Sequence, residues 1–109
     1  MEYFPEEVPK LKIEVRETTR AKDIGLLYLS TYRLHFQPNS IKDFKRAAIY
    51  TVPYGYIYRV IDNANEAKNT GEISVYCKDE RVFKFKFENN FLVYREALRM
   101  LTEGTQIAS

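Results

Sequence analysis

The sequence predicts a mainly β domain in which seven short antiparallel strands form a sandwich or open barrel and one C-terminal helix closes it. Three observations carry this prediction. Nine Tyr and seven Phe residues enrich the chain in side chains that favour strands. Apolar and polar residues alternate in several short segments, and the last segment changes to helical spacing. Because no helix intervenes between the strands, antiparallel pairing is expected.

Alternation and chain breaks define the individual strands. In the first, Leu11, Ile13 and Val15 share one face, and in the last Phe83 and Phe85 do so. Polar or proline-containing segments at 17–23, 38–40, 63–71 and 78–81 are expected to be turns or loops. The expected strands are residues 10–16, 25–30, 32–37, 47–52, 55–62, 72–78 and 82–88.

The C-terminal segment has the spacing of an amphipathic helix. Asn89 and Asn90 suit an N-cap, and Gly104 suits a C-terminal stop. One apolar stripe is expected to face the barrel, and it consists of Phe91, Tyr94, Ala97, Leu98 and Leu101. We therefore expect an N-terminal lead-in at residues 1–9, one domain at 10–105 and a frayed tail at 106–109.

Composition limits the classes of function. The formal net charge of +2 is too small to indicate a nucleic-acid partner, so none is expected. Cys77 is the only cysteine, which excludes an internal disulfide, and no apolar run approaches the roughly 20 residues that span a bilayer. The acidic N-terminus lacks the apolar core of a signal peptide, so a cytoplasmic location is expected.

Four blocks of sequence resemble one family. They are VPKL at residues 8–11, GLLYLSTYRL at 25–34, VPYGYIYRV at 52–60 and CKDER at 77–81, with Phe85 following the last. In this order they resemble the PH-GRAM domain of the myotubularin phosphoinositide phosphatases, which has the pleckstrin-homology (PH) fold. Ser30-Thr31 stands where the family has Thr-Asn.

The resemblance implies a non-catalytic module that binds phosphoinositides and associates peripherally with endosomal or other internal membranes. The family's phosphatase domain carries a Cys-x5-Arg loop, but the position six residues after Cys77 is Phe83. The chain is therefore expected not to be an enzyme and to need no cofactor. The alternative is a protein-interaction module on the same fold, which binds a peptide or a neighbouring domain.

Basic residues between the third and fourth strands are the first candidates for contact with lipid. Lys42, Lys45 and Arg46 could meet anionic headgroups, each contributing roughly 1 kcal/mol. Ile41 and Phe44 alternate with them and could enter the membrane interface. A solvated loop whose two apolar residues fold back on the barrel is the alternative.

Two further cations, Arg20 and Lys22, lie in the expected first loop, and the resemblance implies that this loop binds phosphate, as it does in PH domains. Glu17 and Asp23 offset much of their charge. Surface charge without a ligand is therefore the competing interpretation.

Three tyrosines, Tyr54, Tyr56 and Tyr58, are the candidates for protein interaction. They alternate, so some of their rings must lie outside the core, and exposed Tyr is enriched at recognition surfaces. Cross-strand packing explains the same pattern equally well.

The remaining chemistry-bearing residues suggest no active site or metal site. His35 is the only histidine, so it has no second histidine for a metal or catalytic pair, and it is expected to face solvent. Cys77 is expected to be structural, and Lys84 and Lys86 to keep the sheet soluble. Arg59 and Arg81 are expected to pair with nearby carboxylates, among them Asp62, Asp79 and Glu80.

Overall fold

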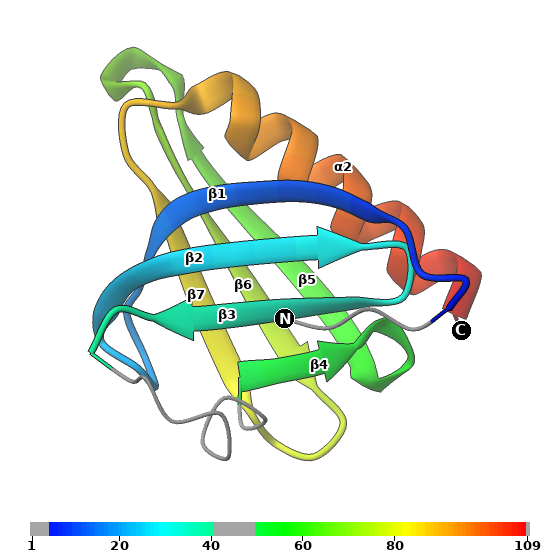
Figure 1. Ribbon diagram of the computed structural model, residues 1–109. Coiled ribbons are helices and arrows are strands. Elements are labelled where there is room, and N and C mark those ends of the chain that lie inside the picture. The colour runs from blue at the N-terminus through cyan, green and yellow to red at the C-terminus, as the bar shows by residue number, and fades with distance from the viewer. Residues whose placement is uncertain (1–4, 41–49, 109) are drawn as a thin grey trace.

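The computed structural model describes residues 5–40 and 50–108, and it confirms the expected fold (Figure 1). Seven antiparallel strands form one open sheet in the order β4-β3-β2-β1-β7-β6-β5, and one helix follows them, as in a PH-like fold. The strands are β1 (Pro9–Glu17), β2 (Asp23–Ser30), β3 (Arg33–Pro38), β4 (Thr51–Pro53), β5 (Ile57–Asn65), β6 (Thr70–Cys77) and β7 (Val82–Phe87). The helix is α2 (Phe91–Ala108), and two short 3-10 turns are η2 (Tyr54–Tyr56) and η3 (Glu66–Lys68).

The sheet consists of two halves that share β1. Along its length β1 pairs with β2, which leads on to β3 and β4. On its other side β1 pairs with β7 only at Arg16 and Glu17. The strands β7, β6 and β5 therefore form a second layer that diverges from the first, and the two layers enclose the core (Figure 1).

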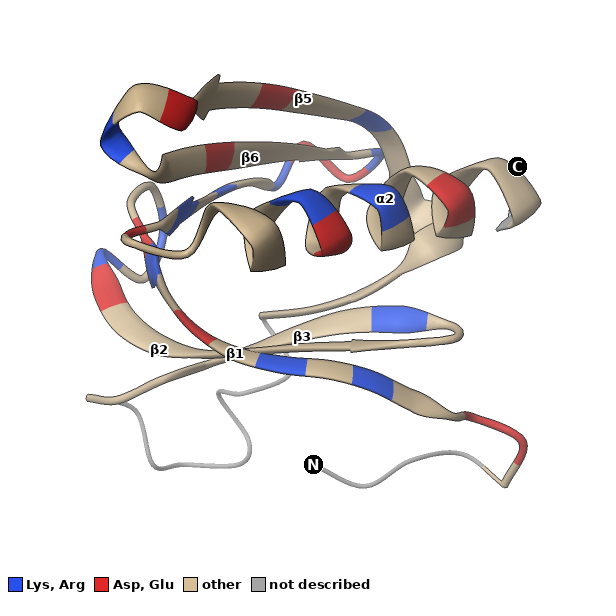
Figure 2. Cartoon of the chain, turned by 90° about the horizontal axis from the view of Figure 1, so that it is seen from above, with Lys and Arg blue, Asp and Glu red and all other residues tan. Residues whose placement is uncertain are grey.

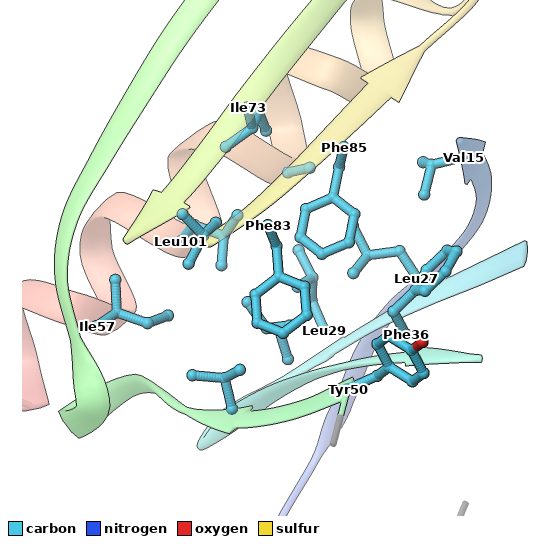
Figure 3. Close-up of a cluster of buried hydrophobic side chains, with 14 of the residues drawn as sticks. Val15, Leu27, Leu29, Phe36, Tyr50, Ile57, Ile73, Phe83, Phe85 and Leu101 are labelled. Carbon is cyan, nitrogen blue, oxygen red and sulfur yellow. The ribbon is translucent and has the colours of Figure 1, made fainter. Parts of the chain in front are cut away.

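The core between the layers combines aliphatic side chains with a group of aromatic rings, among them Phe36, Phe83 and Phe85 (Figure 3). Phe83, Phe85 and Phe87 alternate along β7 with all three rings buried, as their spacing predicts. The Phe83 and Phe85 rings stack with centroids 6.0 Å apart, and Phe36 of β3 reaches Phe85 at 5.7 Å across the core. Contacts of this kind add about 0.5–1.5 kcal/mol beyond the burial of area.

The helix lies across the open side of the sheet, between the β5–β6 layer and the β1–β3 layer (Figure 2). Tyr94, Ala97 and Leu101 are buried, which confirms the predicted apolar stripe. The Asn90 carbonyl accepts a hydrogen bond from Tyr94 N–H at 3.1 Å, and its side-chain oxygen accepts from Val93 N–H at 3.4 Å. Asn90 is thus the predicted N-cap. No helix in the described residues has the length and apolar character needed to cross a bilayer.

The prediction that Gly104 ends the helix is wrong, because α2 continues to Ala108. A Cβ atom on Gly104 would lie 2.6 Å from Cδ2 of Tyr54, so this glycine lets the helix approach a buried ring. The tyrosine belongs to η2, which is distant in sequence. Close packing, and not helix termination, therefore explains the glycine.

Some strand boundaries also differ from the prediction. Residues 55–56 belong to η2, whereas β5 extends to Asn65 and β6 begins at Thr70, inside the expected loop 63–71. Of the expected strand 47–52, residues 50–52 are described, and of these Thr51 and Val52 belong to β4. The Asn65 side chain accepts a hydrogen bond from Lys68 N–H, and Asn69 has a left-handed backbone. These two polar residues therefore border a three-residue turn and not a longer loop.

Replacing Gly104 with Ala tests the packing of the helix on Tyr54. Helix propensity alone would stabilise the variant by about 1 kcal/mol. The clash with Tyr54 predicts instead a net loss of about 1–3 kcal/mol in the free energy of unfolding, measured by denaturant titration. Gly55→Ala is the control, because nothing lies within 4 Å of its added Cβ, and a stabilised Gly104→Ala would contradict this account.

Candidate functional site

The β1–β2 loop and the β6–β7 turn meet at one end of the sheet, which we call the mouth. It comprises residues 18–22 and 78–81 together with the adjoining ends of the neighbouring strands. Thr18 N–H donates to the Lys84 carbonyl and the Thr19 hydroxyl donates to the Val82 carbonyl, both at 2.9 Å. The β1–β2 loop is thereby held against the start of β7, which is more than 50 residues away in the sequence and directly follows the β6–β7 turn.

The carboxylate of Glu17 organises the first of these loops. It accepts hydrogen bonds from the backbone N–H groups of Thr19 (3.1 Å), Arg20 (2.6 Å) and Ala21 (2.7 Å). It also accepts from Lys84 N–H of β7 at 2.8 Å and from the Thr19 hydroxyl at 2.6 Å. Although Glu17 is fully buried, its charge is therefore well compensated by donors.

These donors decide the protonation of Glu17. Burial alone would raise the pKa of its carboxyl group, but the hydrogen bonds from Thr19, Lys84 and Arg20 outweigh burial and lower that pKa. From the sequence, Glu17 is simply an acid that offsets the charge of Arg20 and Lys22. Its position at the end of a strand before a polar loop gives no indication that it gathers the donors of that loop.

Two arginines converge on one buried ring at the mouth. The guanidinium carbon of Arg20 lies 5.7 Å from the centroid of Phe83, and that of Arg81 lies 5.9 Å from the same centroid. Arg20 comes from the β1–β2 loop and is exposed, whereas Arg81 follows the β6–β7 turn and is half-buried. The ring therefore supports cations from both loops through cation–π contacts.

Arg81 has further partners that fix its side chain. Its Nε donates to Asp79 at 2.8 Å, and its Nη1 donates to the Thr51 carbonyl at 3.2 Å. The expectation that Arg81 pairs with a local carboxylate is confirmed for Asp79. Arg59 is exposed on β5 and has no ion pair with any described residue.

Asp23, which follows the β1–β2 loop, forms hydrogen bonds with Ser40, where the β3–β4 connection begins. Lys22 is exposed in the left-handed region at φ 50°, and the next residue, Asp23, accepts from Ser40 N–H at 2.9 Å and from its hydroxyl at 2.8 Å. These two bonds lower the pKa of Asp23. Ser40 is thus fastened beside Lys22.

Tyr50 fixes the other end of the same connection. Its ring meets Phe83 edge-on at 6.3 Å and Phe36 at 6.2 Å. The predicted lipid-binding residues Lys42, Lys45 and Arg46, and the predicted interface residues Ile41 and Phe44, lie outside the described residues. Both residues that flank their segment, Ser40 and Tyr50, are nevertheless placed at the mouth.

The three predicted interaction tyrosines separate into two groups. Tyr54 is a core residue, only 3% exposed, and its hydroxyl donates to the Ser30 carbonyl at 2.7 Å. Its proposed role in protein interaction is therefore corrected, since η2 turns this ring inward under Gly104. Tyr56 and Tyr58 are 56% and 63% exposed, as the alternation of the segment predicts for part of the set.

His35 and Cys77 are both buried. The prediction that His35 faces solvent is wrong: it packs against Tyr28, and its Nδ1 lies 2.6 Å from the Thr51 hydroxyl oxygen. Burial lowers the pKa of His35. Burial raises the pKa of the Cys77 thiol, which fits the expected structural role. Within the described residues, no three His, Cys, Asp or Glu side chains are grouped so that they could hold a metal ion.

The expected lead-in contributes Glu7 to a buried ion pair that no pattern in the sequence indicates. The Glu7 side chain is completely buried and accepts two hydrogen bonds from Arg33, Nε at 2.9 Å and Nη2 at 3.0 Å. The Ser30 hydroxyl also donates to Glu7. Glu7 and Arg33 are 26 residues apart in the sequence, so only their proximity in the folded chain identifies them as partners.

A hollow of about 400 Å³ lies beside α2, away from the mouth. Tyr54 and Lys10 contribute to its walls, as do Glu96, Arg99 and Glu103 of the helix. Arg99 bonds to both glutamates, and Nη1 reaches Glu103 at 2.9 Å. Because these charges compensate one another, this hollow is less suited to an anionic headgroup than the mouth.

Replacing Glu17 with Gln tests the carboxylate network. Because the donors remain but the acceptor loses its charge, we expect a loss of about 1–3 kcal/mol in the free energy of unfolding at neutral pH. The folded-state pKa of Glu17 lies below its unfolded value, so its stabilisation is present above that unfolded value and is lost as the pH falls further.

Unfolding measured between neutral and acidic pH should therefore show the difference between the two proteins shrinking as the pH drops. Glu14→Gln on the exposed part of β1 is the control. A Glu17→Gln difference that stays constant with pH would contradict the proposed role of the charge.

Comparison with known proteins adds no family to this description. No family model matches the chain, and no curated protein matches it significantly.

Proposed function

We propose that the chain is a non-catalytic module that binds phosphoinositide-containing membranes through the mouth. The observation that carries the proposal is the convergence of cations on Phe83. Arg20 and Arg81 lie over its ring, and Lys22 is in the same loop as Arg20. Phosphoinositide headgroups carry clustered phosphates, which several convergent cations neutralise better than one.

The segment between Ser40 and Tyr50 supports the same surface. It contains Lys42, Lys45 and Arg46 against one acid, Asp43. Since Ser40 is bonded to Asp23 and Tyr50 packs on Phe83, the segment begins and ends at the mouth. Its cations would add to those of the β1–β2 loop, and Ile41 and Phe44 would supply apolar contact with the membrane.

The chemistry of the buried groups favours binding over catalysis. Cys77 is buried with a raised pKa, so the nucleophilic thiolate is disfavoured, and Phe83 stands where a Cys-x5-Arg loop needs arginine. The resemblance to myotubularin PH-GRAM domains points in the same direction. In this proposal, the chain itself carries no phosphatase activity.

Vesicle co-sedimentation tests the proposal. The protein should bind phosphatidylcholine vesicles that contain a phosphoinositide more tightly than vesicles of phosphatidylcholine alone, at physiological ionic strength. Each cation near an anionic surface contributes about 1 kcal/mol, so Arg20→Ala with Lys22→Ala should weaken binding by about 30-fold. Replacing Lys42, Lys45 and Arg46 with Glu should abolish binding altogether.

Arg95→Glu, on the exposed surface of α2, is the matched control and should bind as the unaltered protein does. Phosphatidylserine vesicles of equal charge separate headgroup recognition from general attraction to anions. Equal binding to neutral and phosphoinositide vesicles would refute the proposal.

A further inference from the structure

The two edges of the sheet differ in how well they are protected from pairing with another strand. The β4 edge is three residues long and ends at Pro53, which has no N–H to donate. The β5 edge is nine residues long, contains no proline and, among the strands that the structure describes, pairs with β6 alone (Figure 1). A long edge without such protection is a ready template for an added strand.

Exposed aromatic rings lie at the start of the β5 edge. The register of β5 on β6 shifts between Ile57 and Arg59, and this irregularity leaves Tyr58 out of the regular pairing. Tyr58 is 63% exposed, and its ring lies 6.3 Å from that of Tyr76 on β6. Tyr56 immediately before β5 is 56% exposed. Tyrosines in such a cluster are typical anchors of interfaces.

Two cations border these rings. Arg59 is opposite Tyr76 in the register, and Lys78 donates its backbone N–H to the Tyr56 carbonyl at 2.7 Å. Both side chains are exposed, and neither forms an ion pair with a residue that the structure describes.

The neighbouring acids compensate these cations only partly. Asp79 forms an ion pair with Arg81. Asp62 is paired in the register with the buried Ile73, so the Asp62 side chain lies on the same, helix-facing side of the sheet as Ile73. There its charge acts on Tyr94 of α2, adding to burial in raising the pKa of that hydroxyl. Glu80 is the remaining acid of the β6–β7 turn and is exposed. The outer surface beside Tyr58 thus has an excess of positive charge.

We propose that the β5 edge binds an extended acidic peptide, which adds a strand to the sheet. The peptide backbone would pair with the free N–H and C=O groups of β5. An apolar side chain of the peptide would pack on Tyr56 and Tyr58, and its carboxylates would pair with Arg59 and Lys78. The surface comprises backbone, rings and charge together, and of its named residues Lys78 alone, at the start of the β6–β7 turn, belongs to the mouth.

Two labelled peptides as long as β5 test this proposal. In one, valine alternates with glutamate, and in the other lysine replaces glutamate. Binding is followed by fluorescence anisotropy and by changes in the backbone amide NMR signals. The glutamate peptide should shift the amide signals of β5. It should also bind about ten-fold or more tightly than the lysine peptide, because its carboxylates form ion pairs with Arg59 and Lys78 that the lysine peptide cannot form.

Two sets of variants locate the effect. Arg59→Glu with Lys78→Glu should weaken binding of the glutamate peptide by about ten-fold or more, whereas Lys10→Glu with Arg95→Glu adds the same charge elsewhere and should not. Tyr58→Ala should also weaken binding, with Tyr32→Ala, an exposed tyrosine on the β2–β3 turn, as its control. Tyr58→Ala, which lies on β5 and outside the mouth, should not change vesicle binding, which separates this proposal from the proposed lipid function.

Three results would overturn the proposal. They are no saturable binding of the glutamate peptide, signal changes centred on α2 or the mouth in place of β5, and equal binding of both peptides. Self-association of the protein that Tyr58→Ala abolishes would also contradict it, because the occupant of the edge would then be a second copy.

Discussion

The buried carboxylate of Glu17 joins the two halves of this sheet. The paired residues between β1 and β7 are only Arg16 with Lys86 and Glu17 with Phe85, so the backbone ladder there is short. Glu17 extends the joint with a bond to Lys84 N–H, while it also collects the N–H groups of the loop that follows β1. If these donors lost their acceptor, several buried polar groups would be left unsatisfied at the one place where the layers are connected. The position of Phe83 relative to the loop depends on the same joint.

The sequence predicted the elements better than their connections. Alternation along β7 and helical spacing along α2 are local signals, and both were confirmed because a half-buried strand or helix must repeat its apolar residues at the period of its backbone. The errors concern partners that are distant in sequence. Glu7 meets Arg33 across 26 residues, and Gly104 meets Tyr54 across 50. The periodicity of a sequence contains no information about such pairs. The polarity of the segment around Glu7 therefore predicts a lead-in, and the glycine at position 104 predicts the end of a helix.

His35 illustrates the same limit on one strand. Alternation places it opposite the core residues Leu34 and Phe36, and it does lie on the outer side of β3, where it pairs with Tyr28 and Thr51. The prediction of exposure failed because this row of side chains covers the imidazole, and Lys12 in turn extends over the Tyr28 ring at 5.7 Å. The direction of a side chain follows from strand geometry, but its burial depends on the sizes of its cross-strand neighbours.

The way the β1–β2 loop is held has a consequence for the mouth. Glu17 binds this loop through backbone N–H groups, and the Thr19 hydroxyl binds the Val82 carbonyl, so the fold does not need the charges of Arg20 or Lys22. In contrast, the guanidinium of Arg81 forms an ion pair with Asp79 and donates a hydrogen bond to the Thr51 carbonyl. Arg81 therefore stabilises its turn. A loop fixed by its backbone can present cations in a set position at little entropic cost, because the main chain does not have to be ordered again when an anion arrives. This separation of scaffold from charge is the physical reason why the proposed contact with a ligand involves Arg20 and Lys22 ahead of the other cations that the structure describes at the mouth.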